Sequence, residues 1–128
     1  MLITGLILAA LAGAIHVYIF VLESVRWTQP ATRRIFGVRS AEDAETMRSL
    51  AYNQGFYNLF LAVAALLGVV LVIAGLTTVG VTLVLAGTGM MLAAALVLVL
   101  SDRTKLRPAA VQGILPLLAV VAVSVGIA

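Results

Sequence analysis

The sequence contains no cysteine, a single histidine and little charge, and each shortage excludes a class of site or fold. Without cysteine the chain forms no disulfide, no thiolate metal site and no cysteine nucleophile. One histidine excludes a two-histidine haem or zinc site within one subunit. Charged residues make up only 10% of the 128 residues, too few to cover the surface of a soluble domain. The composition therefore points to a membrane protein.

Apolar residues dominate instead: 63% of the chain is hydrophobic and the mean hydropathy is +1.20. As a helix, about 20 apolar residues cross the roughly 30 Å hydrocarbon core of a bilayer. The sequence has four uncharged runs of suitable length, at residues 2–22, 49–74, 78–100 and 109–127. We therefore predict an all-α fold: a single domain, residues 1–128, that forms a transmembrane four-helix bundle in the lipid bilayer.

All eight basic residues lie in two of the three connections between these runs. The first connection contains Arg26, Arg33, Arg34, Arg39 and Arg48, and the last connection contains Arg103, Lys105 and Arg107. The stretch before the first run, the turn at residues 75–79 and the C-terminus have no Lys or Arg. Under the positive-inside rule, both basic loops are cytoplasmic and both termini lie outside. This topology accounts for the net charge of +3 without a nucleic-acid partner.

Two spans carry small residues at spacings typical of close helix contacts. On the first span, the face we expect to be buried against protein is formed by Gly5, Ala9, Ala12, His16 and Glu23. On the third span, Gly80 and Gly87 favour a second close contact. Because four spans enclose only a narrow core, we expect one face to be used within the subunit and the other in a homo-oligomer.

The second membrane helix is predicted to begin in the cytoplasm, well before its apolar run. Ser40 is a suitable N-cap, and the acidic residues after it complement a helix N-terminus. A predicted packing seam then follows spacings of three and four residues. Its members are Asp43, Met47, Leu50, Gln54, Asn58 (or Tyr57), Leu61, Ala65 and Gly68. In the preceding loop, Trp27 suits an anchor at the membrane interface.

Seven polar residues lie within two or three turns of the loop-bearing helix ends, where a bilayer tolerates them poorly. They are His16, Glu23, Asn53, Gln54, Asn58, Asp102 and Gln112. Tyr57 adds a phenol to the amides of the second span, which gives this helix many donors and acceptors. We expect these side chains, apart from Asp102, to line a pocket open to the cytoplasm, in which His16 faces Gln54 or Asn58.

Each of these residues also has an interpretation without a ligand. His16 could carry protons, contact a ligand or bind a metal, or it could donate to a helix carbonyl or to Gln54. Glu23 could orient a cation, pair with His16 through water or act as a base, or it could form a salt bridge with Arg26 or with a loop arginine. The amides could instead hold helices together, at about 0.6 kcal/mol per contact.

No phosphate-binding loop, nucleophile triad, pair of catalytic carboxylates or metal-ligand spacing occurs in the sequence. We therefore expect neither a metal nor a cofactor. Asp102 is expected to neutralise Arg103 or Lys105 at the membrane surface.

Two strings of residues carry a resemblance to a known family. One runs from His16 to Glu23, with Trp27 after it, and the other runs from Asn53 to Ala62. Together with Phe36-Gly37 and Gln112-Gly113, they make nearly the whole chain similar to an uncharacterised family of small bacterial four-span membrane proteins, catalogued as domain of unknown function 1304. The family's Gln-Gly-x-Pro element is imperfect here, because Pro116 comes four residues after Gln112. The resemblance implies a multi-pass protein of the bacterial inner membrane and supplies no chemistry.

A weaker similarity is to the four-span membrane proteins of eicosanoid and glutathione metabolism, in which an arginine-rich loop precedes an asparagine-bearing second helix. Arg48 and Asn53 correspond to that pattern, but Phe56 stands where an acid is expected three residues later. This similarity implies a membrane-bound, glutathione-type transferase as one alternative. The first hypothesis remains a module that binds or conducts a small polar or amphipathic ligand, and the third is a structural membrane subunit.

Overall fold

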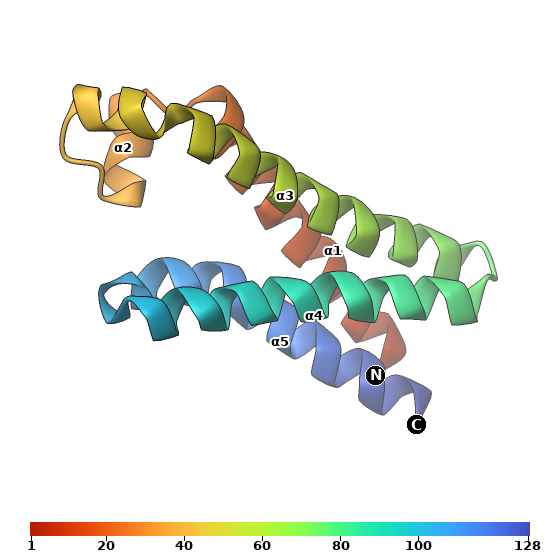
Figure 1. Cartoon of the computed structure of the whole chain (residues 1–128). Coiled ribbons are helices and arrows are strands. Elements are labelled where there is room, and N and C mark those ends of the chain that lie inside the picture. Colours follow the sequence, from red (N-terminus) through yellow and green to blue (C-terminus); the bar gives the residue numbers. More distant parts are fainter.

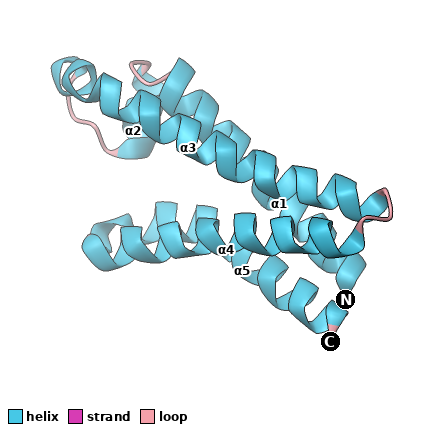
Figure 2. Ribbon diagram, turned by 45° about the vertical axis from the view of Figure 1, so that its right-hand side comes forward, coloured by secondary structure: helices cyan, strands magenta, loops and turns pink.

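The computed structural model describes residues 1–128 and is entirely helical (Figures 1 and 2). Its elements are α1 (Leu2–Phe20), the π-helix η1 (Val21–Val25), α2 (Pro30–Phe36), α3 (Ala41–Ile73), α4 (Thr77–Ser101), the 3₁₀ helix η2 (Arg103–Lys105) and α5 (Leu106–Ile127). Four segments are long and apolar enough to cross a membrane: α1 with η1, α3, α4, and η2 with α5. The chain is therefore a multi-pass membrane protein.

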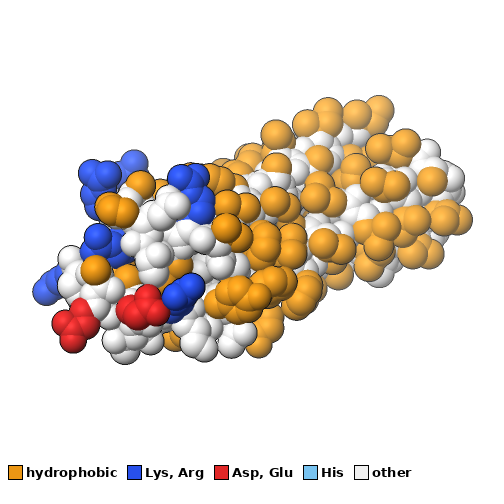
Figure 3. All heavy atoms as spheres, turned by 90° about the horizontal axis from the view of Figure 1, so that it is seen from above, with side chains coloured by type: hydrophobic (Ala, Val, Ile, Leu, Met, Phe, Trp, Pro, Cys, Tyr) orange, Lys and Arg blue, Asp and Glu red, His pale blue; other side chains and the backbone are white.

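The four long helices form a ring in which each packs against two neighbours. Helix α1 contacts α3 and α5, and α4 contacts the same two helices from the other side. Both termini and the α3–α4 turn lie at one end of the bundle, and α2 lies at the other, which we call the loop end (Figure 1). The α1–α3 pair and the α4–α5 pair diverge toward the loop end in both ribbon views. In Figure 3 the charged side chains on the visible face gather at one end, and many apolar side chains lie over the rest.

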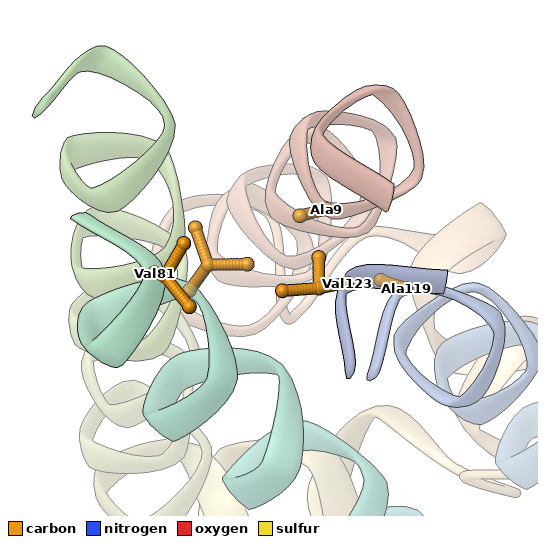
Figure 4. Packing of buried hydrophobic residues seen from close by; sticks show 5 residues of the cluster. Ala9, Val81, Ala119 and Val123 are labelled. Carbon is orange, nitrogen blue, oxygen red and sulfur yellow. The ribbon is translucent and has the colours of Figure 1, made fainter. Parts of the chain in front are cut away.

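Small side chains allow the helix backbones to approach closely. A Cβ atom added at Gly80 of α4 would lie 2.6 Å from Val72 N and 2.7 Å from Gly68 O on α3. Without a strong hydrophobic force between helices in lipid, such close van der Waals contact is a main source of helix association. The core between α1, α4 and α5 is likewise built from side chains no larger than valine: Ala9, Val81, Val84, Ala119 and Val123 (Figure 4).

The predicted buried face of the first span is confirmed, because all five of its residues are buried. We predicted that one small-residue face packs within the subunit and the other between subunits. This prediction is wrong, because both faces pack against helices of the same subunit. A Cβ at Gly5 would lie 2.5 Å from Val123 Cγ2 on α5, and one at Gly87 would lie 2.9 Å from Ala65 N on α3.

The start of α3 is confirmed at residue level, because Ser40 Oγ accepts a hydrogen bond of 2.9 Å from Asp43 N. The predicted seam along α3 is wrong in its loop-end half, where Met47, Leu50 and Gln54 are exposed. The buried face instead consists of Ala44, Ala51, Gly55, Asn58, Ala62, Ala65 and Gly68. Small residues take these positions because the neighbouring backbone leaves no room for larger ones.

Candidate functional site

A π-helical turn positions Glu23 at the loop end of the first span. In η1 the backbone N–H of Arg26 donates to Val21 O over five residues, at 2.9 Å, in place of the four-residue spacing of an α-helix. Such turns are rare and occur frequently at functional sites. Glu23 is only 8% exposed, although it is an acidic residue in a membrane-spanning segment.

The Glu23 carboxylate is held by an amide of α3. Asn58 Nδ2 donates to Glu23 Oε2 at 2.8 Å and to Gln54 O, on its own helix, at 3.1 Å. No protein donor reaches the other oxygen, Oε1, which is not fully shielded from solvent. Glu23 forms no salt bridge with Arg26 or with a loop arginine, and Arg26 Nε donates instead to Gln29 Oε1 at 2.9 Å.

The chain after Glu23 is fastened to α3 by two further hydrogen bonds. Ser24 Oγ donates to Tyr52 O at 2.8 Å, and Trp27 Nε1 donates to Ala44 O at 2.8 Å. Gly55 makes this contact possible, because a Cβ atom there would collide with Ser24 Oγ. The prediction that Trp27 anchors the membrane interface is wrong: its indole is buried against α3 and stacks at a tilt on Phe36.

A cavity of about 450 Å³ lies where η1 and the following loop meet α3. We call it the loop-end cavity; its lining residues are Glu23, Ser24, Val25, Trp27, Thr28, Glu45, Arg48, Ser49 and Tyr52. Glu23 is the buried acid of this lining. The exposed pair formed by Glu45 and Arg48, with Oε1 and Nη1 3.2 Å apart, belongs to the outer part. Six of the nine lining residues are polar or charged, and the other three are Val25, Trp27 and Tyr52, so the cavity offers both hydrogen-bonding groups and apolar surface to a ligand.

His16 lies deeper in the bundle and is 1% exposed. Its Nδ1 donates to Ala12 O, 2.9 Å away on its own helix, since a carbonyl oxygen can only accept. This is the helix-carbonyl interpretation that the sequence left open. The expectation that His16 faces the Gln54 side chain is wrong, because that side chain is exposed. Gln54 contributes its backbone carbonyl to the Asn58 interaction instead.

The other predicted residues do not gather around Glu23. The side chains of Asn53 and Tyr57 are exposed on α3, and Gln112 is half-buried on α5. Asp102 caps η2 by accepting hydrogen bonds from Thr104 Oγ1 (2.6 Å) and Thr104 N (2.9 Å). Hydrogen bonds from the Thr104 hydroxyl and then its N–H hold the pKa of Asp102 below its usual value. It forms no salt bridge with a neighbouring base.

Sequence reasoning overlooked most of the cavity lining. Of its members only Glu23 was a predicted ligand contact, and Arg48 entered through the transferase similarity. The missed residues lie in or just after the π-turn (Ser24, Val25, Trp27 and Thr28) or in the first part of α3 (Glu45, Ser49 and Tyr52). The available signal was the spacing of Ala44, Ala51 and Gly55, which indicates the face of α3 that packs against α1 and η1. The structure groups no three side chains of His, Cys, Asp or Glu that could hold a metal ion.

The chain belongs to the family described as protein of unknown function (DUF1304), whose sequence profile matches residues 10–124. This confirms the family resemblance carried by the two strings of residues around Glu23 and Asn58. No curated protein and no solved structure matches the chain. The family description assigns no activity, so a function must be argued from the geometry.

Proposed function

We propose that this membrane protein binds a small polar or amphipathic ligand in the loop-end cavity, with Glu23 as the principal contact. One observation carries the proposal: Glu23 is buried, lines the cavity and has one carboxylate oxygen without a donor in the protein. An ionisable side chain within a membrane segment is expensive to bury and marks a functional site by default. A ligand that donates to Oε1 would satisfy it.

Binding is better supported than conduction. Beyond Glu23, toward the turn end, the bundle is closed by side chains without exposed surface, among them Ala12, Ala65 and Met91, which pack against one another. His16 is buried on the same side of the first span and is held by its own helix. A solute in the cavity would therefore have to reopen this core to cross the bundle.

We also propose that the loop end faces the cytoplasm of a bacterial cell, in its inner membrane, with both termini outside. The support is the distribution of basic residues, because Lys and Arg near span ends set the orientation. The ligand would then enter from the cytoplasm. A homo-oligomer remains part of the proposal; it would use surfaces other than the two small-residue faces, since these contact helices of the same subunit.

The two alternatives differ in their support. For a glutathione-type transferase, Arg48 lines the cavity but is paired with Glu45, and Asn53 lies outside the lining. For a structural subunit, the hydrogen bonds from Asn58, Ser24 and Trp27 are the supporting observation, because all three fasten η1 or the loop after it to α3. That function predicts stability effects on mutation and no ligand response.

The experiment uses Trp27, the only tryptophan of the chain, as a reporter inside the cavity. Its fluorescence is recorded on the purified protein while pools of small polar and amphipathic metabolites, glutathione included, are titrated. We expect a saturable change that Glu23→Gln abolishes and that Glu42→Gln, an equal charge change at an exposed position outside the lining, preserves. Ligand binding at this cavity would be refuted if no pool changes the fluorescence of the wild-type protein, or if both variants lose the fluorescence change to the same extent.

A further inference from the structure

The charges of the loop-end cavity do not balance. Its lining contains two acids, Glu23 and Glu45, and one base, Arg48. Arg48 Nη1 lies 3.2 Å from Glu45 Oε1, and both side chains are well exposed, at 65% and 63%. The base is therefore engaged with the outer acid, and the inner acid has no basic partner within salt-bridge distance. When Glu23 is ionised, its negative charge is therefore the one in the lining without a basic partner.

The only protein donor to this carboxylate is neutral. The Asn58 amide donates one hydrogen bond to Oε2 and another to Gln54 O. A buried charge without an opposite charge is strongly destabilising, whereas a paired and hydrogen-bonded one is tolerated. A ligand with a positive charge at Oε1 would provide the missing partner.

The remaining lining distinguishes between kinds of cation. Trp27 and Tyr52 provide aromatic surface, which attracts organic cations through the ring quadrupole. Ser49 and Thr28 add hydroxyl oxygens that can accept from an ammonium group. A bare divalent metal would require several carboxylate or imidazole ligands, and no group of three such side chains is present. The cavity volume of about 450 Å³ lies within the range of small-molecule sites.

From this balance of charge and shape we infer that the ligand of the loop-end cavity is a small organic cation, a protonated amine or a quaternary ammonium, bound through Glu23 Oε1. The inference rests on the proposed function and names the chemical class of its ligand. Neutral and anionic molecules of the same shape would leave the carboxylate unpaired or bring a second negative charge beside it.

The test compares three probes that share one ring and differ in charge: benzylammonium, benzyl alcohol and benzoate. Each is titrated into the purified wild-type protein, with Trp27 fluorescence excited where the probes do not absorb. We expect benzylammonium to bind at least roughly tenfold more tightly than the other two, a difference of about 1.4 kcal/mol. Glu23→Gln should remove this preference and Glu42→Gln should retain it. Glu23→Gln keeps an oxygen for Asn58 to donate to, so it removes the charge without removing the interhelical hydrogen bond.

The outcomes separate the two proposals. If benzyl alcohol or benzoate binds as tightly as benzylammonium and Glu23→Gln weakens that binding, the cation inference is overturned and ligand binding at the cavity stands. The inference is also overturned if benzylammonium does not bind the wild-type protein at any concentration below the one at which it changes the fluorescence of free tryptophan. The proposed function is then decided separately by the metabolite titration.

Discussion

Replacing Gly80 of α4 with alanine tests whether backbone contact between α3 and α4 holds the bundle together. The new Cβ would lie 2.6 Å from Val72 N and 2.7 Å from Gly68 O. Both atoms belong to the α3 backbone, which cannot rotate out of the way as a side chain can. Ordinary contact begins near 3.4 Å, so the two helices must separate locally by about 0.8 Å to relieve the contact with Val72 N.

Gly89 provides the matched control on the same helix, because a Cβ there would meet no atom within 4 Å. Both substitutions gain the same helix propensity, about 0.8–1 kcal/mol in water. The difference between the two variants therefore isolates the steric strain, which for overpacking is about 1–3 kcal/mol. We expect Gly80→Ala to be less stable than Gly89→Ala by that amount.

The assay is reversible unfolding of the purified protein in mixed micelles of maltoside and increasing dodecyl sulfate, followed by circular dichroism. Gly80→Ala should unfold at a lower dodecyl sulfate fraction than wild type, and Gly89→Ala at the same or a higher fraction. Equal midpoints for the two variants would refute the reasoning, since they would show that α3 and α4 are not in backbone contact at Gly80.

Three further predictions concern the loop end. Asn58→Ala should lower the free energy of unfolding by about 1–3 kcal/mol, because it leaves a buried acceptor without its donor. As a control in the same assay, Asn53→Ala, at an exposed position, should change the free energy of unfolding by less than about 0.5 kcal/mol. Ser40→Ala removes the N-cap of α3 and should lower the free energy of unfolding by about 0.5–2 kcal/mol; an unchanged midpoint would show that this helix start contributes nothing. Cysteines placed at the exposed Thr78 and Thr104 should react with an impermeant maleimide from opposite sides of sealed vesicles, and reaction of both from one side would refute the four-span topology.

The first span was predictable from sequence to the level of its buried face. The small residues Gly5, Ala9 and Ala12 recur at intervals that place them on one side of a helix. Positions that face lipid do not require small side chains, so this pattern indicates a face packed against another helix. Family membership and the four apolar segments were also predictable, because both depend on composition and local strings of residues. The π-turn at Glu23 was not, since a five-residue hydrogen bond leaves no periodicity of its own in so short a stretch.

The second span was mispredicted for a physical reason. Polar side chains in an apolar run suggest a buried face, and this rule selected Gln54 together with Asn58. It holds only where the helix is surrounded by hydrocarbon. Residues near the first turns of the apolar run of α3 lie at the charged end of the molecule, where an amide can be solvated without a protein partner. There the positions of Ala51 and Gly55 were the better guide, because close backbone approach requires small residues at any depth.

The contact between η1 and α3 contributes both to helix packing and to the proposed binding site. Measuring the two contributions separately decides between a structural role and a binding role. Gly55 admits η1 to the surface of α3, and this approach brings Glu23 within 2.8 Å of Asn58. A structural role uses only Oε2, the oxygen that Asn58 reaches, and a glutamine at position 23 can supply such an oxygen. A binding role uses the charge and the free Oε1 as well. If Glu23→Gln keeps the wild-type unfolding midpoint and loses the ligand response, Glu23 is assigned to binding. If the variant unfolds at a lower midpoint and keeps the ligand response, Glu23 is assigned to the packing of the bundle.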